Sequence, residues 1–344
     1  MADGSTPFPE RAAAREPSAE QIHQALWAYA SAIDAPGLIA RASAESGPKP
    51  GPEPMQGCLR NFQGALIPVA VSPDILAPLE GTLEGPPAPG NWHGCRAEWG
   101  GALHAVAQAR GTFTMAELGC GWGPWMLATG IAARARGLAP RLIGVEASAR
   151  HLTQARQTLA LNGFGADQVT LHHAVAGTPD MAATALFPRD PQGGPGNQGT
   201  HGTITDWGRA AIFETESAPD TALSATHERL RCLSLAEISA GAPLDLLHLD
   251  IQGAELEVVR GNWAEIAARV RRVLIGTHGR ALEGALTAHF ESQGWRLEVE
   301  RPALCRLSET GFESGFETGA DSGADSGRAE VLIDGVQLWR SPGA

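Results

Sequence analysis

No stretch of the sequence approaches the ~20 consecutive apolar residues that a helix needs to cross a bilayer, so we expect no membrane span. The first 21 residues, MADGSTPFPERAAAREPSAEQ, also lack an apolar core, which argues against a secretory signal. Cysteine is scarce: the five cysteines are scattered and form no Cys-x-x-Cys pair. This usage predicts neither a disulfide framework nor a zinc site, and it favours a reducing, cytoplasmic location.

Basic residues are fewer than acidic residues. Lysine and arginine total 26 against 38 aspartates and glutamates, for a formal net charge of −12. Phosphate backbones and anionic lipid surfaces repel a chain of this sign, so we expect no nucleic-acid partner. What is present, 43% hydrophobic and 19% charged residues over 344 positions, is ordinary for a globular protein with a sizeable core. The composition leaves the oligomeric state open.

The first ninety residues carry little regular patterning. Two proline-rich stretches interrupt them, GPKPGPEP at 47–54 and EGPPAPG at 84–90. One helix is predicted over 17–33, with Ser18 as its N-cap and Gln21 at the capping-box position. We therefore expect a helical or irregular extension over 1–90, followed by a domain over 91–344.

Strand and helix patterns alternate from residue 93 onward. Strands are predicted at 113–118, 141–147, 168–177, 244–251 and 271–278, and helices at 93–110, 124–136, 149–161, 254–260 with 263–269, and 281–292. The near-continuous apolar runs among the strands are typical of parallel strands buried on both faces. The sequence thus predicts an α/β class with a Rossmann-like, mostly parallel sheet. Two further strands, 295–300 and 330–339, have no helix between them and predict an antiparallel hairpin at the sheet edge.

Two insertions interrupt this pattern. Residues 177–230 are rich in Gly, Pro, Asn and Asp and far exceed the usual connection of ~2–6 residues, which predicts a lid-like or disordered segment. Residues 308–329 contain the repeat GFES-GFET-GADS-GADS and predict a mobile acidic loop. Calcium binding is the alternative for the repeat, although its spacing matches neither the EF-hand nor the nonapeptide pattern.

The stretch MAELGCGWGPW (115–125) places three alternate glycines between a predicted strand and a predicted helix. Glycines at such a turn permit unusual dihedral angles and let a ligand lie directly on the main chain. The next strand ends in Glu146, and an acid there accepts hydrogen bonds from both hydroxyls of a ribose. The pattern therefore predicts a nucleoside ligand. The candidate contacts are Gly119, Cys120, Gly121, Trp122, Gly123, Glu146 and Ala147.

The spacing distinguishes among nucleoside cofactors. Dinucleotide sites use G-x-G-x-x-G, whereas this turn reads G-x-G-x-G with Glu117 just before it. A carboxylate would repel a pyrophosphate but would favour a ligand with an ammonium and a sulfonium. This favours S-adenosylmethionine over NAD or FAD. The alternative for Glu117 is a cap on the following helix, and the alternative functions are a nicotinamide-dependent oxidoreductase and a non-catalytic cofactor-binding module.

A second motif, LDLLHLDIQGAELEVVRG (244–261), ends a predicted strand at its carboxyl end, where open α/β sheets bind ligands. His248 and Asp250 are two residues apart and point the same way. Gln252 makes the turn, and Glu255 lies in the first helical turn, where an acid is favoured in any case. His248 is interpreted as a core histidine.

Together these pieces resemble the FkbM family of class I S-adenosylmethionine-dependent methyltransferases. The resemblance covers roughly 93–344 and differs at Gln252, where family members often carry glutamate. It rests on AEWGGALHAV (97–106), AELGCGWGPW (116–125), VEAS (145–148), LDLLHLDIQGAELEVVRG (244–261), VLIGTHGRALEGAL (273–286) and DGVQLWR (334–340). It implies a seven-stranded sheet and methylation of a hydroxyl on a sugar, glycan or natural-product-type small molecule.

Methyl transfer to oxygen requires alignment of donor and acceptor and removal of the acceptor's proton. In this fold the strands that end at Asp250 and His278 should be adjacent. His278 is the candidate base, because imidazole titrates near neutral pH; its alternative is a bond to turn backbone. Asp250 could orient His278, accept the proton itself, bind the cofactor or bind a metal.

Further candidates follow from position. Contact with adenine is expected for His173 and Ala174, and contact with the acceptor for Asp206, Trp207, Gln252 and Glu255. Glu98 and Trp99 could cover the cofactor, whereas Trp125 is expected to pack in the core. A divalent metal is not favoured, because the sequence shows no compact ligand cluster, although Asp206, Asp250 and His278 could converge. N-methylation is the nearest rival reaction, but no Asn/Asp-Pro-Pro-Tyr-type run is present.

Overall fold

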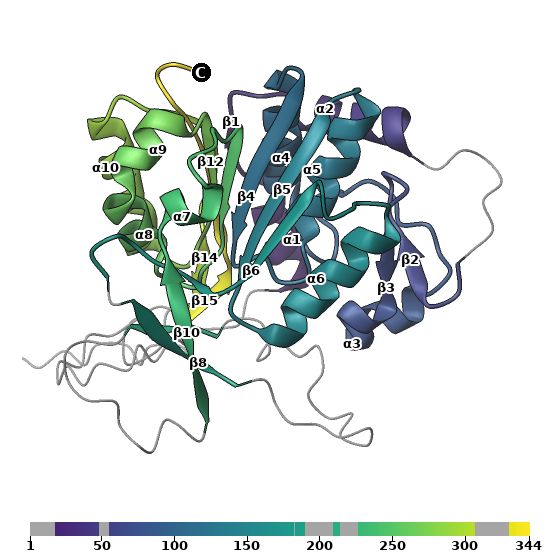
Figure 1. Ribbon diagram of the computed structural model, residues 1–344. Coiled ribbons are helices and arrows are strands. Elements are labelled where there is room, and N and C mark those ends of the chain that lie inside the picture. Colours follow the sequence, from purple (N-terminus) through teal and green to yellow (C-terminus); the bar gives the residue numbers. More distant parts are fainter. Residues whose placement is uncertain (1–17, 48–54, 182, 190–208, 214–225, 307–329) are drawn as a thin grey trace, which may run out of the picture.

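A central sheet with helices on both faces organises the protein (Figure 1). The computed structural model describes residues 18–47, 55–181, 183–189, 209–213, 226–306 and 330–344. In spatial order the strands of the sheet are β1 (Ala30–Ser31), β13 (Arg296–Arg301), β16 (Gly335–Arg340), β12 (Arg272–Thr277), β11 (Leu246–Leu249), β4 (Thr112–Leu118), β5 (Ala139–Glu146) and β6 (Val169–His173). The predicted seven strands are therefore joined by an eighth, β1.

The five strands from β12 to β6 are parallel to one another, which confirms the predicted α/β, Rossmann-like class. Every residue of β11 and β12 is buried, as the continuous apolar runs required. The two C-terminal strands pair antiparallel at one end of the sheet, as predicted, and among the described residues only the two-residue β1 lies beyond β13 in this sheet. β16 lies between β12 and β13 and pairs with both, because its buried residues need neighbours on each side.

Helices cover the two faces of the sheet and bury two hydrophobic cores. One face carries α2 (Ala35–Ser46), α4 (Arg96–Gln108), α5 (Pro124–Ala135) and α6 (Ala149–Leu161). The other carries α7 (Leu235–Ser239), α8 (Glu255–Gly261), α9 (Trp263–Arg269) and α10 (Arg280–Ser292). The helix predicted over 93–110 thus begins only at Arg96, which leaves residues 91–95 as a loop.

The described part of the N-terminal ninety residues packs into the same core as the sheet. Its first helix, α1 (Ala19–Trp27), has the predicted capping box of Ser18 and Gln21 but stops before 30–31, which are extended. The Gln63 amide donates to the carbonyl of Ala128 in α5 at 3.1 Å. The remaining elements here are β2 (Cys58–Arg60), β3 (Leu66–Pro68), α3 (Pro73–Leu76) and the 3-10 turns at Val69–Val71 and Ala77–Leu79. The boundary at residue 90 stays a prediction.

A second, four-stranded sheet begins where β6 ends and projects from the bottom of the view in Figure 1. Its strands are β7 (Val175–Ala176), β10 (His227–Leu233), β8 (Thr184–Pro188) and β9 (Ile212–Phe213). The strand predicted over 168–177 is therefore divided between two sheets, and the described parts of the 177–230 insertion include strands. The acidic repeat lies outside the described residues, and only β14 (Leu304–Arg306) and β15 (Glu330–Ile333), which pair with each other, flank it.

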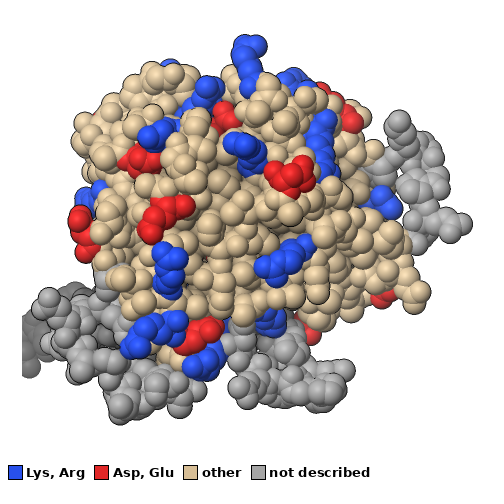
Figure 2. Space-filling model, viewed as in Figure 1, with Lys and Arg blue, Asp and Glu red and all other residues tan. Residues whose placement is uncertain are grey.

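No helix in the described part of the chain is long and apolar enough to span a membrane. On the face that Figure 2 shows, basic and acidic side chains are interspersed. The expected absence of a nucleic-acid partner stays a prediction.

Glu298 ties three strands and a helix together. Its carboxylate lies 2.9 Å from Arg272 Nε, 3.1 Å from Arg340 Nε and 3.6 Å from His104 Nε2. Burial alone would raise the pKa of Glu298, but the bonds from His104 and Arg272 lower it to about 2. These ion pairs therefore stabilise the folded state at neutral pH.

We expect Glu298→Gln to lower the free energy of unfolding by about 3–5 kcal/mol, because Arg272 would stay buried and lose its countercharge. Urea unfolding at pH 7 measures the effect. Because the folded-state pKa is lowered, the wild-type advantage is present above the ordinary value of 4.5 and lost as pH falls through about 2. Coincident unfolding curves at pH 7 would contradict this prediction.

Candidate functional site

The glycine turn is held from both sides at the carboxyl edge of the sheet. The backbone N–H groups of Gly119 and Cys120 both donate to the carbonyl of Val145 at 2.9 Å. Gly119 has φ +74, and a Cβ there would lie 2.0 Å from the carbonyl oxygen of Asp250. The sequence attributed this glycine to a ligand on the main chain. The structure adds a second cause, which is direct contact with the chain just past β11.

Glu146 locks the turn through its carboxylate. One oxygen accepts from the backbone N–H of Gly121 at 2.8 Å, and the other accepts from that of Ser148 at 2.7 Å. The residue is at the end of β5 and is 8% exposed. Each carboxylate oxygen keeps a further lone pair, so the group can still accept from two ligand hydroxyls.

Glu117 points at the start of α5. Its carboxylate accepts from the backbone N–H of Met126 at 2.8 Å and of Trp125 at 3.4 Å, which is the helix-capping alternative. Burial raises the pKa of Glu117 well above its ordinary value, with the charges of Asp250 and Glu146 adding to the shift. A direct contact between Glu117 and a cofactor stays a prediction.

An imidazole clamped between two carboxylates forms the centre of the site. His278 Nε2 lies 3.2 Å from Asp250 Oδ1, and its Nδ1 lies 3.0 Å from Glu255 Oε1. Glu255 is fully buried and also accepts from the backbone N–H of Ile251 and Gly253. The His278 side chain is 4% exposed and that of Asp250 43%. Of these three side chains, that of Asp250 is therefore the one accessible to a ligand. Glu255 could influence a substrate only through the imidazole.

The two carboxylates decide the protonation of the site. Burial lowers the pKa of His278, but the bonds to Asp250 and Glu255 outweigh it and raise that pKa well above 6.5. Burial likewise raises the pKa of Asp250, but His278 brings it below its ordinary value. At neutral pH the pair is an imidazolium and a carboxylate. Asp250 is thus the group able to accept a proton.

Gln252 adds a second donor to Asp250. Its Nε2 lies 2.9 Å from Asp250 Oδ1, the oxygen that already faces His278, and its backbone adopts φ +60 to reach back. Among the described residues Asp250 Oδ2 accepts no side-chain hydrogen bond. The carboxylate is therefore oriented with one oxygen left for a ligand.

Two acids that the sequence left without a role in proton transfer lie beside this centre. Asp334 Oδ1 is 3.9 Å from His278 Nε2, and its carbonyl accepts from Arg301. Glu98 accepts from the backbone N–H of Cys95 at 3.0 Å, and burial raises its pKa to about 7. Asp334 occupies the break between β15 and β16, so its proximity to His278 depends on pairing between distant strands that no local pattern reveals.

A group of aromatic rings covers the glycine turn. Trp92 stacks on Trp122 with centroids 5.3 Å apart, and His93 lies 5.3 Å from Trp122 and 5.9 Å from Trp125. Trp125 in turn lies 5.7 Å from His248. The 91–95 loop is shaped by the Asn91 side chain, whose oxygen accepts from the backbone of Gly94 and from Trp99 Nε1. From the sequence alone, Asn91 and Trp92 have no assigned role, and His93 falls in the helix predicted over 93–110.

The remaining predicted residues are placed as follows. His173 Nε2 lies 3.0 Å from the carbonyl of Ala147, and Ala174 is buried. Both stand at the end of β6, so their contact with adenine stays a prediction. Asp206 and Trp207 lie outside the described residues.

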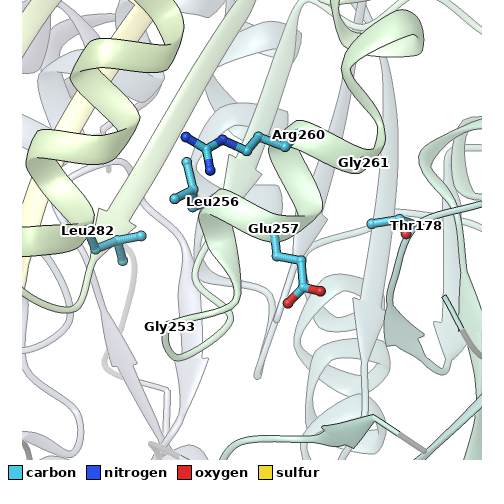
Figure 3. Close-up of a pocket in the computed structure, with 7 residues that line it drawn as sticks. All are labelled: Thr178, Gly253, Leu256, Glu257, Arg260, Gly261 and Leu282. Atoms are coloured by element: carbon cyan, nitrogen blue, oxygen red, sulfur yellow. The ribbon is translucent and has the colours of Figure 1, made fainter. Parts of the chain in front are cut away.

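Asp250, Glu255 and His278 also form a group whose ligand atoms lie within 4.8 Å of one another. The sequence showed no such cluster because Glu255 comes from a buried helical turn. A separate open pocket of about 580 Å³ lies beside α8 and α10, and Figure 3 shows the residues that line it. It does not include Asp250 or His278. Its lining residues are Thr178, Gly253, Leu256, Glu257, Arg260, Gly261 and Leu282.

Comparison with known proteins gives one strong relation. No family model matches the chain. A protein of Jannaschia sp. (strain CCS1) named "Putative methyltransferase" is 42% identical over 288 residues, which are 83% of this chain and 93% of that protein.

The solved structures are more distant. The methyltransferase FkbM of Methylobacillus flagellatus KT has 12% identity and a TM-score of 0.38, and the match covers 71% of this chain but only 53% of that one. The ribosomal protein L11 methylase of Lactobacillus delbrueckii subsp. bulgaricus has 13% identity, coverage of 76% and 86%, and a TM-score of 0.32. Structural similarity at these TM-scores and identities supports no argument about this protein. By its 42% identity over most of both chains, this protein belongs to the methyltransferase family of its Jannaschia relative.

Proposed function

We propose that this methyltransferase is a member of the FkbM family and transfers a methyl group from S-adenosylmethionine to a hydroxyl. The acceptor would be a sugar, a glycan or a natural-product-type small molecule. The observation that carries the proposal is the half-exposed Asp250 carboxylate, held at one oxygen by His278 and Gln252 beside the glycine turn. A group so placed can take the proton of an alcohol.

The residues present fit the methyl donor. Glu146 has acceptor capacity for two ribose hydroxyls, and the glycine turn from Gly119 to Gly123 offers main chain for close approach. When bound, S-adenosylmethionine supplies an electrophilic methyl group on a positively charged sulfur. Asp250, whose pKa is lowered, keeps a negative charge beside the turn, and this charge favours a cationic ligand and opposes the pyrophosphate of NAD.

Three side chains have separate roles in removing the proton of the acceptor. Asp250 Oδ2 accepts the proton of the hydroxyl, while Oδ1 stays bonded to His278 and Gln252. The buried Glu255 keeps His278 protonated and oriented. We therefore assign the proton acceptor to Asp250 and a positioning role to His278, the reverse of the assignment that imidazole chemistry alone suggests.

Calorimetry on the full chain tests the cofactor. We expect a clear isotherm with S-adenosylhomocysteine, the demethylated product, and none with NADH, because the Asp250 carboxylate beside the turn opposes a pyrophosphate. Incubation of small-molecule extracts with methyl-labelled S-adenosylmethionine, followed by mass spectrometry, then identifies the acceptor through its labelled ether. An isotherm with NADH and none with the homocysteine product would reject the proposal in favour of an oxidoreductase.

A further inference from the structure

The pocket beside α8 and α10 adjoins the turn that carries Asp250 (Figure 3). One of its lining residues, Gly253, comes three positions after Asp250, and another, Leu282, comes four positions after His278. The two strands that bring Asp250 and His278 to the carboxyl edge therefore also lead into the pocket. Three residues span at most about 10–11 Å of chain, so the pocket and the Asp250 carboxylate are neighbours.

The Thr178 side of the pocket is fixed to α8. Gly261 packs against Thr178 so closely that a Cβ on the glycine would lie 2.3 Å from Thr178 Cγ2. The next residue, Asn262, donates from its side chain to the carbonyl of Gly177 at 2.8 Å and accepts from the backbone N–H of Leu235 at 2.9 Å. The pocket is therefore a preformed feature of the fold, and its volume of about 580 Å³ is in the range of small-molecule sites.

The lining combines apolar surface with a few polar groups. Leu256 and Leu282 are half-buried and pack on the core beneath them, so each keeps apolar surface that faces the pocket. The polar groups come from Thr178, Glu257 and Arg260. Glu257 and Arg260 carry opposite charges, so the pocket offers no net attraction for an ion. A lining of this kind suits a neutral apolar group of small-molecule size.

Polar chain separates this pocket from the Asp250 carboxylate. Gly253 has φ +100, and nothing lies within 4 Å of the position that a Cβ would take. Gln252, the residue before it, holds its side-chain amide against Asp250. A ligand that fills the pocket and also reaches Asp250 must cross this open turn. An apolar group there would desolvate the amide and the peptide groups, whereas the hydroxyls of a sugar ring can bond to them.

We propose that the pocket binds the apolar group of a glycoside (its aglycone), and that a hydroxyl of the attached sugar lies at Asp250 and is methylated. This inference rests on the proposed function and narrows its acceptor to one class. The sugar oxygen bonds to the methyl carbon as the carbon–sulfur bond of S-adenosylmethionine breaks, and the hydroxyl proton passes to Asp250. The products are a methyl ether of the glycoside and S-adenosylhomocysteine.

Two glucosides that share a sugar test the pocket. Octyl β-D-glucopyranoside, kept below its micelle-forming concentration, carries an apolar chain, whereas methyl β-D-glucopyranoside does not. By calorimetry on the full chain we expect an isotherm with the octyl glucoside and none with the methyl glucoside at the same concentrations. Leu282→Gln should weaken octyl glucoside binding about tenfold, because an amide replaces part of the apolar wall. Leu161→Gln is the matched control and should leave this binding unchanged, because Leu161 is a 41% exposed leucine of α6 outside the pocket.

Label transfer tests the acceptor class. We expect the labelled product formed from small-molecule extracts to be retained on a reversed-phase column, and mild acid to release the label in an unretained sugar. With the retained extract fraction as acceptor, Leu282→Gln should raise KM about tenfold and leave kcat and S-adenosylhomocysteine affinity unchanged.

The outcomes separate this inference from the proposed function. Absence of octyl glucoside binding, equal effects of the two glutamine variants, or label that stays with an apolar fragment after acid would overturn the glycoside assignment and leave the proposed function intact. A wild-type chain that binds no S-adenosylhomocysteine would overturn the proposed function, and this inference with it. Urea unfolding verifies the fold of each variant, and Leu256→Gln repeats the test if Leu282→Gln does not fold.

Discussion

Replacing Asp250 by asparagine is expected to lower the rate of methyl transfer by about 10²–10⁴-fold. The amide keeps the shape of the side chain but cannot take a proton. It also removes the charge that faces the His278 imidazolium at 3.2 Å. Transfer is measured as label from methyl-labelled S-adenosylmethionine in the acceptor, and S-adenosylhomocysteine affinity is measured in parallel to separate chemistry from binding.

Asp334 provides the matched control for this substitution. Its carboxylate also faces His278 Nε2, at 3.9 Å, but it is more exposed and makes the weaker contact. Asp334→Asn should therefore reduce transfer by less than about tenfold. If Asp250→Asn kept half of the wild-type rate, or if the two variants were equally impaired, the proton would have to leave through another group.

The sequence alone did not identify which side chain accepts the proton. Asp250 and His278 follow apolar runs, and the sequence placed both at the carboxyl edge. Which of them carries the proton depends on Glu255, whose position in the first turn of a helix has an ordinary explanation. Only the folded chain shows Glu255 beneath the imidazole, fully buried and 3.0 Å from Nδ1. A long-range contact of this kind leaves no local pattern.

In the fold, too, features with a local sequence signal were predictable, whereas pairing between distant segments was not. Continuous apolar runs and the Ser18 capping box are local signals, and the structure confirms what they predicted. The position of β16 inside the sheet and the pairing of β1 with β13 are choices between distant partners. Local signals also misplaced the start of α4, because residues 91–95 are folded by the Asn91 side chain and not by helix propensity.

The glycine turn offers the second large effect. We expect Gly119→Ala to lower the free energy of unfolding by about 4 kcal/mol or more, since its Cβ would lie 2.0 Å from a backbone oxygen that cannot rotate away. Gly123→Ala is the matched control. It has a similar φ of +80, but its Cβ would meet only ordinary contacts, the nearest at 3.6 Å. It should therefore cost only the left-handed strain of about 1–2 kcal/mol.

Urea unfolding of the two variants without ligand measures the difference. Equal losses of unfolding free energy would mean that glycine is needed at position 119 only for its positive φ. The close approach to Asp250 would then make no contribution. A larger loss at Gly119 would mean that the turn and the end of β11 are held at one fixed separation. In the proposed mechanism the donor rests on the turn and the acceptor's proton passes to Asp250, so that separation would also set the distance between the methyl group and the acceptor oxygen.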